Sequence, residues 1–438
     1  MTRPVTILLF LLGTAHAALA QAPPLRLTLD DSVARGIEAS QRLEELSARQ
    51  DAARAIEGQR EAAERPQIAA TASYTRTNHV EEFSVPNATG GVRVIYPDIP
   101  DNVRSRIDLQ WPIYTGGRLK ALTRAAGVEA EAAGQDREAA RADLKLEITR
   151  AFWAVITARA SQEVVGQALE RTSAHLNDVR NQLAVGLVPP SDVLTIEAQH
   201  ARQRMLGIEA EAIVETATAE FKRLIGLDQD VPVDLVPAAV TSSPIAMPFS
   251  AAVNELRADR PERKSLLFRI TAAEQRVAAA SAGSLPVLTA IGGYDMARPN
   301  PRIFPIQEKW KPSWDIGINL RWSLFDGGRV RAETAEAAAN RRGIEARLRD
   351  FDAVLQVEVR QRLAEVKSAF AAIEAAVAGM RAAAEARRVI AERFSAGVAT
   401  NTDVLNAQTV LLQAELDVTR ARANAELASA RFMRALGR

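Results

Sequence analysis

Residues able to carry out covalent or metal chemistry are scarce in this sequence. It contains no cysteine, which excludes a thiol nucleophile, a disulfide and a zinc–thiolate site. Its four histidines, His16, His79, His175 and His200, form no pair four residues apart and have no acid nearby at metal-ligand spacing. We interpret the last three as solvated surface residues. We therefore expect no catalytic residue, no metal site and no cofactor, and conclude that the chain is not an enzyme.

Two glycine pairs come nearest to a phosphate-binding motif. Gly116-Gly117 and Gly327-Gly328 each stand between an alternating segment and a long alanine-rich one. A phosphate-binding loop needs a Gly-x-x-x-x-Gly-Lys pattern, which neither pair continues into. The other interpretation is a tight turn from strand to helix, where glycine adopts backbone angles that a larger residue resists.

Charge and composition limit the classes of protein to which the chain can belong. The 438 residues include 55 basic and 54 acidic side chains, for a net charge of +1, and no cluster of basic residues favours nucleic acid. Hydrophobic residues make up 47% of the chain, enough to bury a large core in two or three domains.

The N-terminus carries an export signal. Arg3 precedes an apolar run over residues 5–12, and the small-residue segment Ala18-Leu19-Ala20 follows before Gln21. A membrane-spanning helix needs roughly 20 apolar residues, and this run has less than half of that. We therefore predict a secretory signal peptide at residues 1–20.

The chain is internally duplicated. Three pairs of segments match at one offset of 211 residues: 111–118 with 322–329, 185–194 with 396–405, and 221–226 with 432–437. They predict a first repeat at 21–232 and a second at 249–438, joined by a proline-rich linker at 233–248. The first repeat carries nine additional residues between Tyr74 and Trp111, which we place in a loop.

Long helices dominate both repeats. Proline is absent from Ile113 to Val188 and after Pro312, and apolar residues recur in alternating steps of three and four over several heptads, the spacing of a coiled coil. Gly186 and Gly397 mark the helix ends. Capping residues follow each glycine: Ser191 with Asp192, and Asn401 or Thr402 with Asp403. We predict long antiparallel helical hairpins at about 117–226 and 328–437.

Four shorter segments predict strands, at about 66–77, 103–114, 286–297 and 314–325. Their alternation of apolar and polar residues is found in membrane barrels and in half-buried sheets of soluble proteins. Four of the five tryptophans and all four tyrosines fall in these strands or their joining loops, which is typical of an interfacial girdle. Because the smallest membrane barrels close at about eight strands, a barrel would have to be shared between chains.

This ordered set resembles the TolC-like outer-membrane efflux channels, also called outer membrane factors, over essentially the whole expected mature chain. The resemblance rests on the duplicated strand hairpin and long helix, the Gly-Gly-Arg exits at 116–118 and 327–329, and the Gly-x5-Asp-Val-Leu turns at 186–194 and 397–405. It implies an α-helical protein with a membrane β-barrel, each half a β-hairpin plus long antiparallel coiled-coil helices. The implied assembly is a homotrimer with a shared 12-stranded barrel and a periplasmic helical tunnel.

The resemblance also implies a function. The chain would lie in the outer membrane, in contact with its lipid, extend into the periplasm, and serve as the passive exit duct of a tripartite efflux or type I secretion system. Its partners would be a periplasmic adaptor (membrane fusion) protein and an inner-membrane pump of the RND or ABC type, with no nucleic acid. The alternative is a periplasmic coiled-coil adaptor or structural protein, which explains the heptads and the export but not the aromatic-tipped strands.

The two helix turns acquire roles from the resemblance. The segments Val185-Gly186-Leu187 and Ala396-Gly397-Val398 would form the periplasmic tip that meets the adaptor. Asp403 would line the narrow periplasmic gate, with Asp192 as its counterpart in the first half and Asn406 where relatives carry a second acid. The other interpretation of Asp403 is a simple complement to the helix dipole.

Two departures concern the closed tip. Relatives carry an arginine where this chain has Ala399 and a tyrosine where it has Phe394. The polar lock that holds such tips closed is therefore not defined by the sequence.

Overall fold

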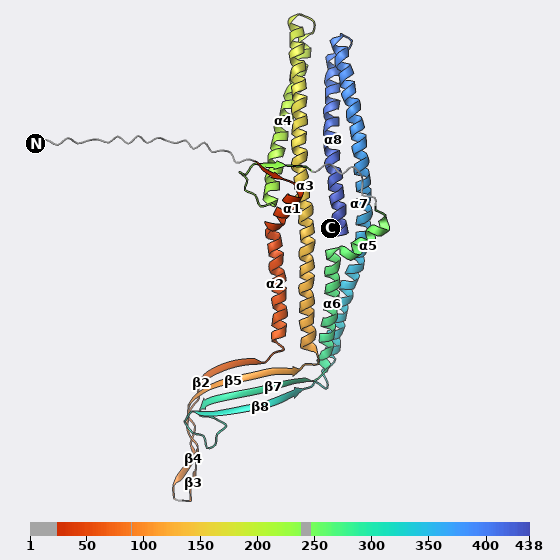
Figure 1. The fold of residues 1–438 in the computed structure, drawn as a ribbon. Helices are drawn as coiled ribbons and strands as arrows, with labels where there is room; N and C mark the ends of the chain where they lie inside the picture. Colours follow the sequence, from red (N-terminus) through yellow and green to blue (C-terminus); the bar gives the residue numbers. More distant parts are fainter. Residues whose placement is uncertain (1–23, 89, 238–246) are drawn as a thin grey trace, which may run out of the picture. The chain divides into compact units, whose positions relative to one another are not determined.

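A computed structural model describes residues 24–88, 90–237 and 247–438 (Figure 1). The predicted signal peptide at 1–20 lies outside the described residues, and so does the part of the predicted linker at 238–246.

The two repeats contain the same kinds of element in the same order. The first consists of β1 (Leu25–Leu27), α1 (Leu29–Glu38), α2 (Gln41–Ala62), β2 (Gln67–Arg76), β3 (Phe83–Pro86), β4 (Val92–Tyr96), β5 (Asp101–Tyr114), α3 (Arg118–Ala184) and α4 (Pro190–Leu224). After β6 (Val233–Leu235), the second consists of α5 (Phe249–Asp259), α6 (Pro261–Ser281), the short 3-10 helix η1 (Ala282–Ser284), β7 (Val287–Arg298), β8 (Lys311–Arg321), α7 (Arg329–Ser395) and α8 (Asn401–Leu436). No helix among the described residues is both long and apolar enough to cross a membrane.

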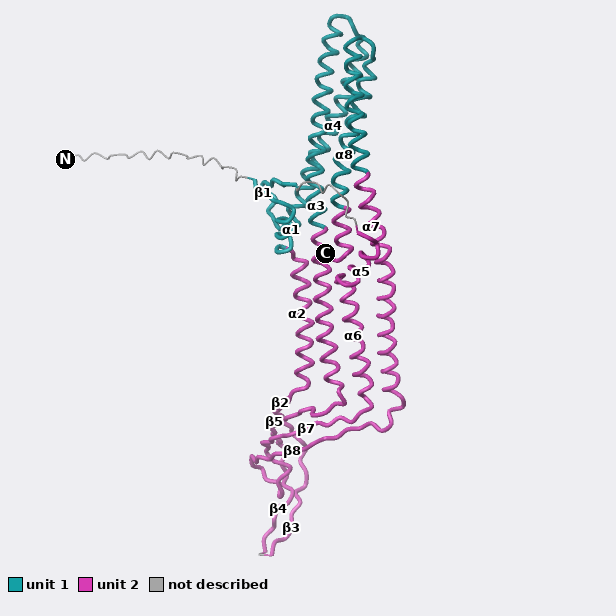
Figure 2. Tube along the Cα trace, turned by 45° about the vertical axis from the view of Figure 1, so that its right-hand side comes forward, with its two compact units in different colours: residues 1–39, 147–242, 372–427 teal, residues 40–146, 243–371, 428–438 magenta. Residues whose placement is uncertain are grey.

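These elements form two compact units, each drawing on both repeats (Figure 2). Unit 1 comprises the residues up to Ala39, 147–242 and 372–427, and unit 2 comprises 40–146, 243–371 and 428–438. The helix turns at Gly186 and Gly397 belong to unit 1, and all four long strands belong to unit 2.

Unit 2 contains an antiparallel sheet in the order β2-β5-β7-β8, whose four strands lie side by side in Figure 1. The central pair, β5 and β7, joins the two repeats. The outer edges of β2 and β8 have no strand partner among the described residues. Such edges present unpaired backbone N–H and C=O groups that favour pairing with another chain.

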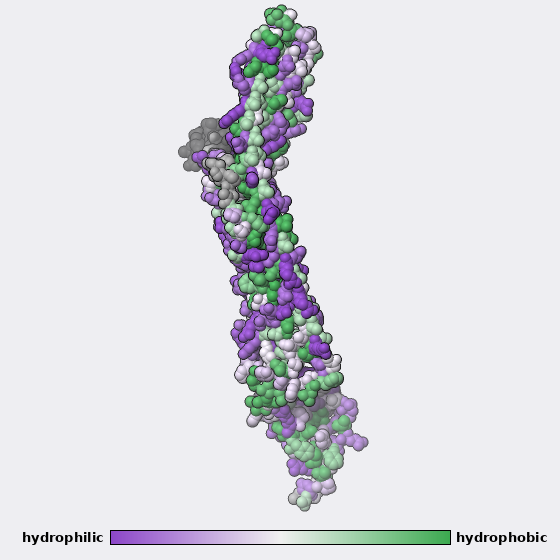
Figure 3. Space-filling model, turned by 90° about the vertical axis from the view of Figure 1, so that its right-hand side faces the viewer, coloured by the Kyte–Doolittle hydropathy of each residue, from purple (hydrophilic) through white to green (hydrophobic). Residues whose placement is uncertain are grey.

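One face of this sheet is apolar and exposed. Strand register places its members together because successive residues point to opposite faces. The exposed apolar residues are Ile68, Tyr74, Ile107, Trp111, Tyr294, Trp314, Ile316, Ile318 and Leu320. Figure 3 shows hydrophobic residues gathered at the level of the strands on the face of unit 2 that it presents. An exposed patch of this extent marks a contact with another protein or with a membrane.

The structure departs from three details of the sequence analysis. Strand β8 begins at Lys311 and ends at Arg321, about three residues before the predicted segment at each end. The nine additional residues of the first repeat accompany a separate hairpin, β3–β4, rather than a plain loop. The start of the predicted linker forms β6, which pairs in parallel with β1 of unit 1.

The helices of each unit pack through the apolar positions of their coiled-coil spacing. In unit 1, one cluster consists of Leu176, Val179, Val193, Ile196 and Leu405. In unit 2, the main cluster is Ala252, Leu256, Leu355, Val359, Val366, Ala428, Phe432 and Leu436. Full burial of a large aliphatic or aromatic side chain contributes about 1.5–3 kcal/mol, so these clusters provide much of the stability of the hairpins.

Candidate functional site

Both helix turns of unit 1 are closed by the same backbone motif. Gly186 and Gly397 have φ angles of 76° and 75°. The N–H of Leu187 donates to the carbonyl of Gln182 at 2.9 Å, and the N–H of Val398 donates to that of Arg393 at 2.8 Å. This is the Schellman arrangement, which needs a left-handed residue after the helix and therefore favours glycine.

Apolar side chains at these turns are exposed. Val185, Leu187 and Val398 are exposed by 71%, 74% and 64%. A Cβ built on either glycine would have no heavy atom within 4 Å, so the backbone there is also open. Exposed apolar side chains beside an accessible backbone form a surface that another protein can pack against.

Asp403 lies in the first turn of α8, the helix that follows the second turn, and bonds back to the residue that caps it. Its Oδ2 accepts hydrogen bonds from the Thr400 hydroxyl at 2.7 Å and the Thr400 N–H at 2.9 Å, while its own N–H donates to the Thr400 Oγ1. The Thr400 hydroxyl and then its N–H hold the pKa of Asp403 below the usual value. The predicted caps Asn401 and Thr402 were therefore wrong, because Thr400 takes the capping position.

The side chains of the predicted gate differ in exposure. Asp403 and Asn406 are exposed and lie three residues apart, on one face of α8. Asp192 lies in the first turn of α4 and is half-buried. No side-chain hydrogen bond caps α4, whose N-cap residue is Pro189, so the predicted Ser191 cap was also wrong.

A buried polar seam joins α3 to α8 in unit 1. We use this name for three pairs: Arg171 with Glu415, Thr172 with Gln408, and His175 with Asn401, joined by side-chain hydrogen bonds at 2.8, 3.0 and 2.7 Å. Thr172, His175, Asn401 and Gln408 are each less than 9% exposed. Burying a polar group costs little free energy while its hydrogen-bond partner is present. It costs much more when that partner is removed.

Asn401 is the branching point of this seam. Its Oδ1 accepts from His175, and its Nδ2 donates to the backbone carbonyl of Asp192 at 3.2 Å, so one side chain connects α8 with both α3 and α4. The His175 ring also meets Phe394 edge to face, with ring centroids 5.1 Å apart. The interpretation of His175 as a solvated surface residue was therefore wrong. Its partner lies 226 residues away, which no local pattern could indicate.

The glycine pairs in unit 2 serve as strand-to-helix turns. Gly116, Gly117, Gly327 and Gly328 have φ angles of 64°, 84°, 66° and 88°. A Cβ on Gly116 would lie 2.7 Å from the Cβ of Leu285, so space as well as conformation requires glycine there.

The carboxylate of Asp326 occupies the position that a phosphate would take at the start of α7. Its oxygens accept from the N–H groups of Gly328 at 2.9 Å and Val330 at 3.0 Å. The hydrogen bond from Val330, followed by that from Gly328, lowers the pKa of Asp326. A carboxylate that already fills these donors argues against a phosphate site at this glycine pair.

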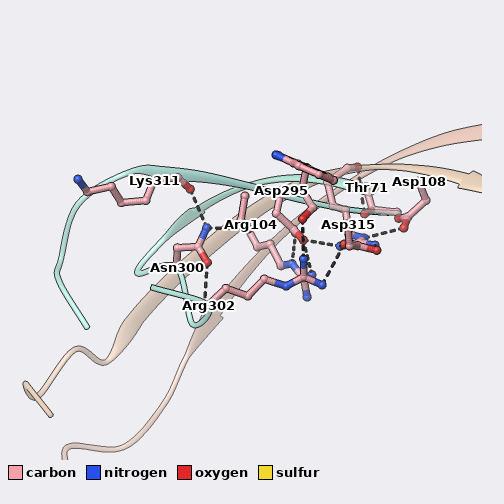
Figure 4. Close-up of polar contacts among 11 residues, drawn as sticks. Thr71, Arg104, Asp108, Asp295, Asn300, Arg302, Lys311 and Asp315 are labelled. Carbon is pink, nitrogen blue, oxygen red and sulfur yellow. Dashed lines mark hydrogen bonds and ion pairs between the residues drawn. The ribbon is translucent and has the colours of Figure 1, made fainter. Parts of the chain in front are cut away.

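The polar face of the sheet carries an ion-pair network that the sequence analysis did not find (Figure 4). The Arg106 guanidinium donates to both oxygens of Asp315, at 3.0 and 3.2 Å, and its Nε donates to Asp108 at 2.6 Å. It also contacts Asp295, which accepts from Arg104 at 2.5 and 3.0 Å. The network links β5, β7 and β8.

Arg106 reaches β8 because Gly293 leaves room above β7. In register, Gly293 lies between Asp108 on one side and Asp315 on the other. A Cβ on Gly293 would stand only 2.0 Å from Nη2 of Arg106, so a larger residue there would displace the guanidinium from this position. Among the described residues, no group of three or more histidine or acidic side chains is placed to hold a metal ion.

The family model of outer membrane efflux proteins matches residues 35–227 and 252–438, one range in each repeat. A search of curated proteins finds no match.

Solved structures share the fold of the chain. The outer membrane protein VceC from Vibrio cholerae is 20% identical with a TM-score of 0.78, over 93% of this chain and 96% of that one. The CmeC outer membrane channel of Campylobacter jejuni is 18% identical with a TM-score of 0.77, over 93% and 85%. The open-state MtrE outer membrane channel of Neisseria gonorrhoeae is 18% identical with a TM-score of 0.74, over 93% and 88%.

Proposed function

The chain belongs to the outer membrane efflux protein family, and we propose that the tip turns of unit 1 form the gate and the adaptor-binding end of the channel that this family provides. The protein is an outer-membrane channel that extends into the periplasm and serves as the exit duct of a tripartite efflux system. Channels of this family are trimers that work with an adaptor protein and an inner-membrane pump.

The observation that carries this function is the four-stranded sheet of unit 2. It has an exposed apolar face with tryptophan and tyrosine, a polar face with charged residues, and two edges, at β2 and β8, that pair with no other strand of the described chain. Four strands cannot close a membrane barrel alone, whereas three copies joined edge to edge supply 12. The apolar face then meets lipid and the polar face lines the pore.

Asp403 is proposed as the acidic residue of the periplasmic gate. It is exposed on α8 and is held ionised by the two hydrogen bonds from Thr400. In a trimer it forms a ring of three carboxylates, which attracts cations strongly across a constriction. Asn406, on the same face, is neutral, so the ring carries no second layer of charge.

The polar seam is proposed as the lock that keeps the tip closed. Ala399 and Phe394 cannot supply the polar contacts of an arginine and a tyrosine, and the seam would supply polar contacts instead. It connects the α3–α4 hairpin to α8 through Asn401. Hydrogen bonds between the hairpins separate more readily than an apolar core because water can replace each partner once the joint opens. The same joint also contains apolar contacts, because Leu405 of α8 packs in the cluster formed with α3 and α4.

The adaptor is proposed to bind the segments Val185-Gly186-Leu187 and Ala396-Gly397-Val398. Their exposed apolar side chains and open glycine backbone suit close packing against a helical hairpin of the adaptor. We propose an inner-membrane pump of the RND or ABC type as the energy source, since the duct itself only conducts.

A measurement of native mass tests the function. The protein is extracted from outer membranes in mild detergent and its mass is determined by native mass spectrometry. A trimer that resists salt washing is the expected result, because three sheets must share one barrel. A monomer released into the soluble periplasm would favour a coiled-coil adaptor or structural protein instead.

A further inference from the structure

The loop between β7 and β8, residues 299–310, makes two ion pairs with the sheet: Glu308 pairs with Arg298 at the end of β7, and Arg302 pairs with Asp315 of β8. The Arg302 guanidinium lies 2.9 Å from Oδ1 of Asp315 and donates to the backbone carbonyl of Trp314 at 3.2 Å. Figure 4 shows this guanidinium beside Asp315, close to Arg104 and Asp295.

The base of the loop is fixed by Asn300. This residue is only 2% exposed, and its Nδ2 donates to the Lys311 carbonyl at 2.9 Å and to the Ser313 Oγ at 3.0 Å. Its Oδ1 accepts from the N–H of Arg302 at 3.0 Å, which aims the arginine toward β8. The backbone at the start of the loop is therefore positioned for the contact with Asp315.

Asp315 identifies the face of the sheet on which Arg302 lies. Its neighbours along β8, Trp314 and Ile316, are 72% and 78% exposed on the apolar face. Asp315 points the other way, where it also receives both hydrogen bonds from Arg106. Arg302 thus draws the loop over the polar face and away from the apolar one.

We propose that Arg302 is a latch that holds the β7–β8 loop across the outer mouth of the pore. The inference rests on the proposed function, in which three polar faces line one barrel. Strands β7 and β8 connect to the helices at their other ends, so this loop lies at the end of the barrel remote from the periplasm. Three latched loops then narrow the extracellular opening.

The contact is suited to reversible opening. The Arg302 side chain remains 46% exposed, and that of Asp315 is 27% exposed. Exposed ion pairs contribute little stability and are weakened by salt. When Arg302 leaves, Asp315 keeps its two hydrogen bonds from Arg106. Release of the loop therefore does not leave the Asp315 carboxylate without a partner.

Single-channel recording in planar bilayers tests the latch. The recording uses Asn401→Leu, which removes the proposed lock of the tip, as the parent protein, so that the tip does not limit the current. On this parent, Arg302→Ala should raise the conductance of the trimer further, because the loops no longer narrow the mouth. The matched control is Arg321→Ala. It removes a positive charge from the face of β8 that carries Asp315, but at the end of the strand away from the loop. The control should keep the conductance of the Asn401→Leu parent.

Two results would overturn the latch while leaving the channel intact. One is a trimeric pore in which Arg302→Ala leaves the conductance of the Asn401→Leu parent unchanged. The other is an equal rise in Arg321→Ala, which would assign the effect to pore charge. A wild-type protein that forms no trimeric pore would instead overturn the proposed function itself. Native mass and heat resistance of each variant trimer establish that both variants fold.

Discussion

The Nε2 atom of His175 lies 2.7 Å from the Oδ1 atom of Asn401, in a buried joint between α3 and α8. Because Asn401 also donates to the carbonyl of Asp192, one amide side chain holds three helices of unit 1 together. This joint is the centre of the polar lock that we propose for the tip.

Replacing Asn401 by leucine should open this lock. The change leaves the imidazole N–H and the Asp192 carbonyl without their partner, and a buried unsatisfied polar group costs about 1–3 kcal/mol. We expect a higher conductance in planar bilayers without adaptor. The exposed neighbour Thr402 provides the control, since Thr402→Leu removes no hydrogen bond of the seam. A tip as tightly closed in Asn401→Leu as in wild type would contradict the lock.

Asp403 should control block by multivalent cations. Added on the periplasmic side, such cations should reduce the current, and Asp403→Ala should relieve the block because the ring of carboxylates is gone. Asn406→Asp should strengthen the block by adding a second charge on the same face of α8. Current traces with and without the cation measure both effects. Block that survives in Asp403→Ala would remove this residue from the gate.

The pH dependence of this block follows from Thr400. Its hydroxyl and N–H lower the pKa of Asp403 relative to the unfolded chain, so the charge and the capping contribution are present above the usual value of 3.8 and are lost only as pH falls through the lower, folded value. Thr400→Val removes the hydroxyl and raises that pKa. The midpoint of block against pH should therefore move upward, whereas Thr402→Val should leave it in place. Equal midpoints would show that the hydroxyl does not act on the carboxylate.

Gly293 should be intolerant of even one added carbon. In Gly293→Ala the new Cβ would meet the Arg106 guanidinium, which must then leave Asp315. The temperature at which the trimer dissociates should fall by several degrees. Gly292→Ala is the matched control, because a Cβ there has its nearest contacts at 3.7 Å, an ordinary distance. Similar melting of the two variants on heated gels would argue against the steric role.

The adaptor contact can be probed with charge at the tip. Leu187→Asp and Val398→Asp should each weaken adaptor binding at least about tenfold, equivalent to about 1.4 kcal/mol, by placing a carboxylate in an apolar contact. Val80→Asp adds the same charge at a residue outside the tip that is 56% exposed. Surface plasmon resonance with immobilised trimer gives the affinities. Unchanged affinity in both tip variants would move the adaptor site elsewhere.

The repeated architecture could be predicted because its signals are local. Glycine at Gly186 and Gly397, the heptad spacing and the alternation of strand residues each reflect contacts within a few positions along the chain. The order of the strands in the sheet and the identity of the capping residue were harder to predict from the sequence. Thr400 and Asn401 are both plausible caps, and only the competing partners of Asn401 decide between them.

The polar contacts of the candidate sites could not be predicted for a different reason. Arg106 and Asp315 are 209 residues apart, and His175 and Asn401 are 226 apart. In a single sequence such side chains resemble any solvated charge or lone histidine. Their pairing is determined by strand register and by the approach of two helices that belong to different repeats.

The parallel pairing of β1 with β6 constrains the order in which the protein can fold after export. The Leu25 N–H donates to the Pro232 carbonyl, and the Val236 N–H donates to that of Leu27, so the strand that leaves the translocon first is completed by one that follows almost the entire first repeat. Contacts between residues so distant in sequence form slowly. Until they form, the first strand keeps its backbone N–H and C=O groups unpaired. Leu25–Leu27 therefore remain unpaired until Val233–Leu235, which follow the first repeat, have also emerged.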